Sequence, residues 1–147
     1  MQIIGKIFYR SLFQFIFVLA LLIISGCSSV PMATEQEDQA AKQFQPSPNS
    51  ALIFVFRDQA FVGAALTIPL FLDGKLVAGI NDFTFCKLDV AAGTHELSSS
   101  GSAFAKLSIQ TEASQIYFVR LTARPRILLV NADEGQRQVQ KCKLVQP

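Results

Sequence analysis

The sequence predicts a mainly β protein, a small antiparallel β-sandwich with a short C-terminal helix, preceded by a signal peptide and a flexible tether. Between Ala51 and Pro147, apolar runs of five to eight residues recur with turn signals between them, a pattern typical of all-β sandwiches and barrels. Asp73-Gly74 separates two strand-like runs and predicts a tight hairpin, since both turn positions need a positive φ. We therefore assign residues 1–26 to the signal peptide, 27–50 to the tether and 51–147 to the sandwich domain.

The N-terminal segment has the composition of an export signal. Lys6 and Arg10 precede a run from Ser11 to Ile24 in which only Ser11 and Gln14 are polar. A membrane-spanning helix needs about 20 apolar residues. The run is therefore short for a permanent span and suits the apolar region of a cleaved signal.

The end of this segment, Ile24-Ser25-Gly26-Cys27, resembles the bacterial lipobox. The resemblance implies that a signal peptidase recognises Ile24, Ser25 and Gly26, and that Cys27 is lipidated and becomes the mature N-terminus. Two or more acyl chains hold a protein stably at a membrane. The alternative is an ordinary signal anchor with an incidental cysteine. Ser28 stands where an Asp retains Gram-negative lipoproteins in the inner membrane, so we expect the outer membrane, on its periplasmic side.

The segment that follows Cys27 is polar as far as Ser50. It holds Pro31, Pro46 and Pro48, together with many Ser, Gln and acidic residues. Such a composition does not bury enough apolar surface to offset the loss of backbone entropy. The sequence therefore predicts a flexible tether, which would span about 25 Å as a random coil.

The strands of the domain are expected where apolar or alternating runs lie between turn signals. The first run is continuously apolar, as in a central strand covered on both faces. The expected strands are Ala51–Phe56, Thr67–Leu72, Lys75–Ile80, Thr84–Val90, Thr94–Ser99, Phe104–Gln110, Gln115–Thr122 and Arg126–Asn131.

A short helix is expected after the last strand, from Asp133 to about Lys141. Asp133 and Gln136 have the spacing of a capping box. Val139 and Cys142 fall three residues apart, on one helical face. Gly135 is the feature that disfavours this helix.

Four segments of the domain resemble the bacterial family called domain of unknown function 2846. They are Phe54–Asp58, Phe71–Val77, Val90–Glu96 and Tyr117–Arg120. The resemblance covers nearly all of Ala51–Leu144 and implies a small lipoprotein or secreted protein. The order of the segments is also similar to PEGA-type, transthyretin-like sandwiches, which are envelope modules and not enzymes. The family brings no catalytic residues to this chain.

The sequence predicts no catalytic set, metal site or cofactor. His95 is the chain's one histidine and follows a Gly turn, so we interpret it as a hydrogen-bonding side chain at the start of a strand. Zinc would need further His or Cys ligands at suitable spacing. A net charge of +2 without a Lys/Arg stripe argues against nucleic-acid binding.

Cys86 and Cys142 remain once Cys27 is lipidated. In an oxidising envelope they favour a disulfide, which would stabilise the fold by about 4 kcal/mol. The alternative is two buried, apolar thiols.

Arg120, Arg124 and Arg126 crowd around Pro125. They form either a patch for a small anionic ligand or lipid headgroup, or an ordinary solvated loop whose ion pairs contribute little.

Taken together, the sequence predicts a membrane-anchored envelope lipoprotein with a non-enzymatic module and a structural or protein-interaction role. The membrane, through the N-terminal lipid, and an envelope protein are its expected partners. The alternative is a lipoprotein that recognises an anionic glycan, lipid or peptide through its loops.

Overall fold

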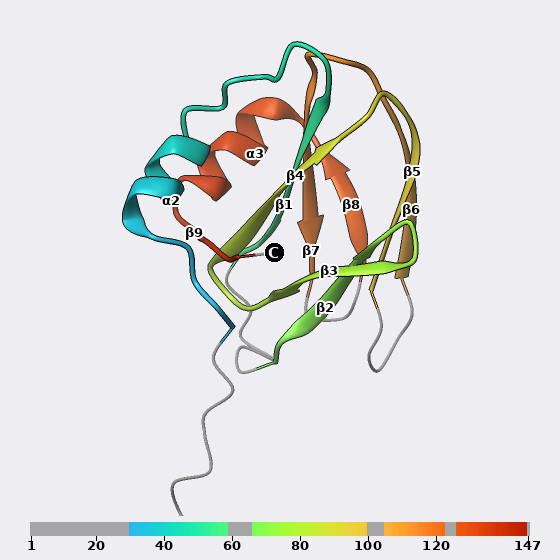
Figure 1. The fold of residues 1–147 in the computed structure, drawn as a ribbon. Coiled ribbons are helices and arrows are strands. Elements are labelled where there is room, and N and C mark those ends of the chain that lie inside the picture. The colour runs from blue at the N-terminus through green and yellow to red at the C-terminus, as the bar shows by residue number, and fades with distance from the viewer. Residues whose placement is uncertain (1–29, 59–65, 100–104, 123–125, 147) are drawn as a thin grey trace, which may run out of the picture.

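A computed structural model describes residues 30–58, 66–99, 105–122 and 126–146, and within these ranges the chain is mainly β (Figure 1). The signal peptide, Cys27, Ser28 and Arg124 lie outside the described residues. The elements are α2 (Glu35–Ala41), β1 (Ala51–Arg57), β2 (Ile68–Leu72), β3 (Lys75–Ile80), β4 (Thr84–Val90), β5 (Gly93–Ser99), β6 (Ala105–Thr111), β7 (Ile116–Leu121), β8 (Ile127–Val130), α3 (Ala132–Val139) and β9 (Lys143–Leu144).

The strands form two sheets, as the sequence predicts. One sheet has the order β8-β7-β1-β4-β9 and the other β3-β2-β5-β6. The four-stranded sheet is antiparallel throughout. The five-stranded sheet is mixed, because β1 runs parallel to β7 and β4 runs parallel to β9. The parallel pairs and β9 are not predicted from the sequence.

The central strand β1 is buried along its whole length, because both faces of its sheet are covered. Ile53 and Val55 belong to the core between the two sheets. Phe54 and Phe56 alternate with them and belong to a second core on the outer face. The continuously apolar run is therefore a central strand, as predicted.

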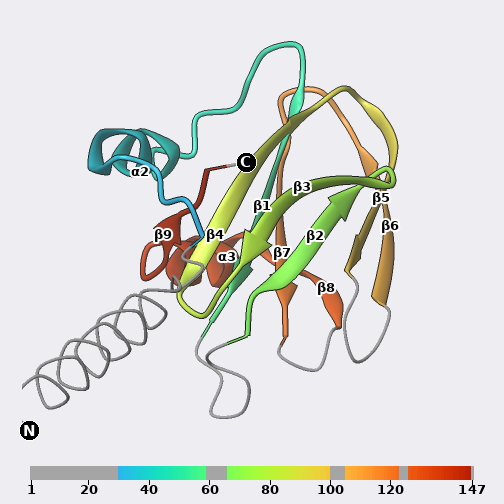
Figure 2. The same ribbon diagram turned by 60° about the horizontal axis from the view of Figure 1, so that its bottom comes forward.

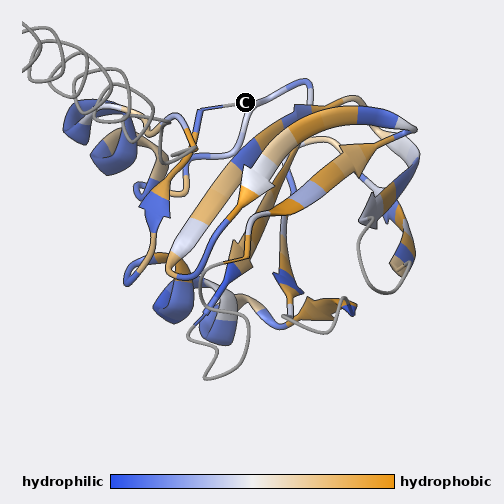
Figure 3. Cartoon of the chain, turned by 90° about the horizontal axis from the view of Figure 1, so that it is seen from below, coloured by the Kyte–Doolittle hydropathy of each residue, from blue (hydrophilic) through white to orange (hydrophobic). Residues whose placement is uncertain are grey.

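The second core is aromatic and lies under the two helices. Phe54 stacks on Phe118 and Phe85, with ring centroids 5.4 and 6.0 Å apart. Phe44, which follows α2, packs edge-on against Phe54 and Phe118. Figure 3 shows that the helices are mostly hydrophilic, whereas apolar residues run along the strands.

The C-terminal helix is confirmed, but it begins earlier than predicted. Its N-cap is Asn131, whose side chain accepts a hydrogen bond from the Glu134 N–H. Gly135 lies against the ring of Phe118, where an added Cβ would lie 2.2 Å from Phe118 Cγ. Gly135 thus permits close packing of the helix on the sheet.

The tether prediction needs correcting from Val30 onward, because this segment packs on the domain. Residues 31–33 pair with the C-terminal strand segment: the Ala33 N–H donates to the Leu144 carbonyl, and the Gln146 N–H donates to the Pro31 carbonyl. Asp38 is buried and accepts a hydrogen bond from the Leu144 N–H at 2.7 Å. Helix α2 begins with a capping box between Thr34 and Glu37. The capping box stabilises the helix although the segment is mostly polar.

One end of the sandwich, which we call the base, contains the end of β1 and the starts of β2 and β4 (Figures 1 and 2). Arg57 is fully buried there and ties the two sheets together. Its guanidinium donates to the Leu66 carbonyl at 2.6 Å and pairs with Asp82 at 2.8 Å. Val30 also reaches the base, beside Thr67 and Gly79. In the described part of the chain, no helix is long and apolar enough to span a membrane.

Candidate functional site

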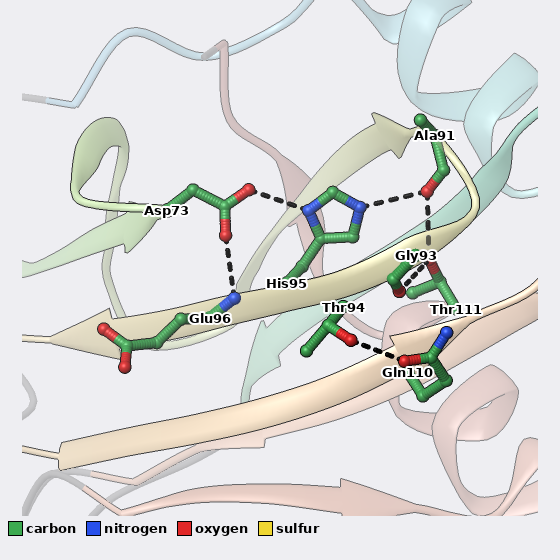
Figure 4. Close-up of polar contacts among 8 residues, drawn as sticks. All are labelled: Asp73, Ala91, Gly93, Thr94, His95, Glu96, Gln110 and Thr111. Atoms are coloured by element: carbon green, nitrogen blue, oxygen red, sulfur yellow. Dashed lines mark hydrogen bonds and ion pairs between the residues drawn. The ribbon is translucent and has the colours of Figure 1, made fainter.

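The most organised polar site joins the β2–β3 hairpin to β5, at the end of the sandwich opposite the base (Figure 4). His95 Nδ1 lies 2.7 Å from Asp73 Oδ2 in the hairpin turn, and His95 Nε2 lies 3.0 Å from the Ala91 carbonyl oxygen. His95 is therefore a hydrogen-bonding residue of the strand, as the sequence predicts.

Asp73 makes this connection from a constrained turn. Its φ is 51° and that of Gly74 is 78°, which is the backbone that an Asp-Gly hairpin needs. Its second carboxylate oxygen accepts a hydrogen bond from the Glu96 N–H at 2.8 Å, and its own N–H donates to the Glu96 carbonyl. The hairpin turn is thus held by both the backbone and the side chain of β5.

The turn before β5 is fixed by Thr111. Its hydroxyl lies 3.0 Å from the Ala91 carbonyl oxygen and 3.1 Å from the Gly93 carbonyl oxygen. Gly93 has a φ of 147°, a conformation that favours glycine. The Asp-Gly and Gly-Thr-His segments, separate in the sequence, therefore form one contiguous clamp.

The electrostatics of the clamp favour a charged histidine. Both His95 nitrogens face acceptors, and only an imidazolium donates to both. The hydrogen bond to Asp73, and after it the one to the Ala91 carbonyl, raises the pKa of His95 above its usual value, whereas burial acts in the opposite direction. The same bond to His95, together with the Glu96 N–H, lowers the pKa of Asp73.

The clamp differs from a catalytic Asp–His pair in what its second nitrogen contacts. In a hydrolase, Nε2 faces the nucleophile that it deprotonates. Here Nε2 faces the Ala91 carbonyl, which has no proton to give. This geometry orders the hairpin. Within the described ranges, no group of three His, Cys, Asp or Glu residues is arranged to hold a metal ion.

The predicted arginine patch is only partly assembled by the described residues. Arg120 pairs with Asp58 at 2.6 Å and with Glu134 at 3.2 Å, so its charge is already compensated. Arg126 is exposed directly before β8, and Arg124 lies outside the described residues.

The predicted disulfide between Cys86 and Cys142 is not formed, and both residues are buried free thiols. Cys86 lies in the core between the sheets, whereas Cys142 lies in the aromatic core on the outer face. Successive side chains of β4 point to opposite faces of the sheet. Phe85 therefore faces the outer core that contains Cys142, whereas Cys86 faces the core between the sheets. Desolvation raises the pKa of each thiol to about 12.

Two features of the described chain were not found from the sequence. One is the buried Arg57, whose position directly after a fully apolar run was the available signal. The other is a pocket of about 330 Å³ between α2 and the C-terminal strand, which docking of the N-terminal segment creates. Its lining is Ala33, Glu37, Ala40, Ala41, Lys87, Leu144, Val145 and Gln146.

Comparison with known proteins supports the resemblance seen in the sequence. The profile of a family described as "Protein of unknown function (DUF2846)" matches residues 47–132, which include all strands from β1 to β8. An uncharacterized protein of Haemophilus influenzae is 29% identical over 132 residues, covering 84% of this chain and 78% of that protein.

Proposed function

The chain belongs to the DUF2846 family of proteins of unknown function, and starting from that membership we propose that it is a lipid-anchored, non-enzymatic module of the bacterial cell envelope. Its role in this proposal is structural or protein-binding. The lipid on Cys27 holds it in the outer membrane, with the domain in the periplasm.

The observation that carries the proposal is the sequence Ile24-Ser25-Gly26-Cys27 directly after a short apolar run. Small residues before the cysteine suit a peptidase that must accept the chain beside a lipid-modified residue. The described part of the chain begins at Val30, three residues after this cysteine, and Val30 already packs against the core of the domain. An anchor and a domain are thus adjacent along the chain.

The clamp supports the non-enzymatic part of the proposal. A general base needs a nitrogen within hydrogen-bond reach of the proton that it removes. Both nitrogens of His95 are already engaged, one by a carboxylate and one by a backbone carbonyl. His95 is the chain's one histidine, so no other imidazole is available for this chemistry.

Mass spectrometry of the mature protein tests the anchor. We expect a chain that begins at Cys27 and carries a diacylglycerol on the thiol and an acyl group on the amine. Cys27→Ser should leave an unprocessed precursor. Cys86→Ser is the matched control and should be processed and lipidated normally. An unmodified Cys27 within an intact chain would contradict the proposal.

The partner is tested separately, by crosslinking in intact envelopes and purification of the lipidated protein. We expect a defined envelope protein in the crosslinked product, absent when Cys27→Ser prevents anchoring. Recovery of lipid alone would contradict a protein-binding role.

A second candidate function is recognition of an anionic ligand, and the pocket beside α2 favours it. The pocket is mainly apolar, and its charged lining residues are Lys87 and Glu37. Because the Glu37 carboxylate is engaged by the Thr34 N–H and hydroxyl, Lys87 is the group that would pair with an amphipathic anion. Thermal-shift measurements with anionic glycans and lipids test it. Stabilisation that Lys87→Gln removes would support this function, whereas stabilisation that Arg126→Gln removes would place the ligand at the arginine loop.

A further inference from the structure

We propose that the base of the sandwich is the membrane-facing surface, and that Leu66 and Phe83 rest on the lipid leaflet that holds Cys27. The inference rests on the proposed lipid anchor and adds the orientation of the domain, with the clamp turned away from the bilayer.

The first step is the length of the link. The Pro31 carbonyl accepts a hydrogen bond from Gln146, so the N-terminal segment is held to the domain from this point. Val30 packs beside Thr67 and Gly79 at the base. The link from Cys27 to Val30 is three residues long and spans at most about 11 Å when fully extended. This length is less than the radius of gyration of a 100-residue domain, about 13 Å, so the surface around Val30 is held close to the membrane.

The second step is the chemistry of that surface. Leu66, next to Thr67, is 54% exposed, and Phe83 is 44% exposed. Large apolar side chains gain free energy when they leave water for the boundary between headgroups and acyl chains. An anchored domain that touched the membrane elsewhere would leave both of these side chains in water.

The third step is rigidity, because a membrane-facing surface keeps its orientation only if its parts are fixed. Arg57 donates to the Leu66 carbonyl and pairs with Asp82, the residue before Phe83. The Phe83 carbonyl in turn accepts a hydrogen bond from the Lys143 N–H at 2.8 Å. Leu66 and Phe83 are therefore held on either side of one buried guanidinium.

The chain supplies a matched control residue. Leu76 is 58% exposed, close to the value for Leu66, but it lies beside the hairpin turn at the other end of the same pair of strands. Five residues of strand separate the two positions by roughly 16 Å. The two leucines thus share residue type and exposure and differ in their expected distance from the membrane.

The test uses the mature lipidated protein in vesicles of phosphatidylethanolamine and phosphatidylglycerol that contain a lipid with a nitroxide on its headgroup. Leu66→Cys and Leu76→Cys are labelled separately with a fluorescent maleimide, while the buried native thiols stay unlabelled. We expect quenching to be several-fold stronger at position 66 than at position 76. A Gly/Ser linker of about twelve residues, spanning roughly 20 Å and inserted before Val30, should remove most of this difference.

Equal quenching at the two positions, or stronger quenching at position 76, would overturn the proposed orientation. Quenching that the inserted linker leaves unchanged would overturn the role of the short link. Flotation of the vesicles separates these results from failure of the anchor. A protein that does not float with the vesicles would overturn the lipid anchor and the orientation together, whereas one that floats with equal quenching would overturn the orientation alone.

Discussion

His95 and Asp73 give the domain a pH-dependent stability whose direction follows from their pKa shifts. The folded pKa of His95 lies above its unfolded value, so its contribution is complete below about pH 6.5 and is lost as pH rises through the folded pKa. The folded pKa of Asp73 lies below its unfolded value, so its contribution is present above about pH 3.9 and is lost as pH falls through the folded pKa. The clamp is therefore strongest between these values.

The chain's one histidine makes this prediction measurable by NMR titration of a single imidazole. We expect a pKa above 6.5, which Asp73→Asn lowers. The stability that Asp73→Asn removes should be below about 1 kcal/mol, because the Asp73 side chain is 49% exposed. Lys106→Met, which removes the exposed ion pair with Glu96 and leaves Asp73 in place, is the control and should leave the His95 pKa nearly unchanged. An unshifted pKa in the native protein would contradict the clamp.

The two buried thiols predict a specific labelling pattern. In the folded, lipidated protein, a maleimide should react with neither Cys86 nor Cys142, because both are buried and have a pKa of about 12. After unfolding without reductant, two equivalents should react, as counted by intact mass. No uptake after unfolding would show a disulfide. A third equivalent would show that Cys27 is not lipidated.

At the scale of the element, Gly135 decides how closely α3 approaches the sheet. In an isolated helix, Gly→Ala stabilises by about 1 kcal/mol. Here an added Cβ would lie 2.2–2.6 Å from three atoms of Phe118, so we expect Gly135→Ala to destabilise the domain by about 3 kcal/mol. Urea denaturation measures this change. The exposed Gln136→Ala on the same helix is the control and should be neutral or slightly stabilising. Stabilisation by Gly135→Ala would contradict the packing.

The strands were predictable because their signals are local. Alternating or continuous apolar runs and the Asp-Gly turn place β1–β8 to within a residue or two. Asn131 was missed as the helix cap because Asp133 offers a similar cap two residues later. The disulfide prediction failed for another reason. Spacing placed Cys142 on a buried face, but the sequence did not show that Phe85, and not Cys86, lies opposite it across that core.

The clamp was predictable only in part. The turn at Asp73-Gly74 and the hydrogen-bonding role of His95 follow from local sequence. Their contact does not, because it depends on β2 pairing with β5. The buried Arg57 was missed for a similar reason: its partners Leu66 and Asp82 lie in the segments before β2 and before β4, and only the assembled sheets bring both to the guanidinium.

At the scale of the whole molecule, the boundary of the domain is the main revision. The sequence predicts a tether to Ser50 because residues 28–50 are polar. The few apolar residues among them have partners far along the chain: Met32 pairs with Val145, and Phe44 contacts Phe118. Composition does not reveal such contacts. In the proposed lipoprotein they shorten the link between Cys27 and the domain from about 25 Å as a random coil to at most about 11 Å when fully extended.

This boundary predicts the effect of shortening the chain. A protein that starts at Ser47, where the family match begins, lacks α2 and Phe44 and exposes part of the aromatic core. Compared with a protein that starts at Val30, we expect it to lose at least about 3 kcal/mol, since the partly buried Phe44 is removed together with the buried Ala41 and Asp38. Phe44→Ala in the longer protein should reproduce a substantial part of the loss, whereas the exposed Gln39→Ala should have little effect. Equal urea midpoints for the two proteins would show that residues 30–46 do not stabilise the domain, as expected of a flexible tether. That result would also contradict the short link on which the proposed membrane orientation depends.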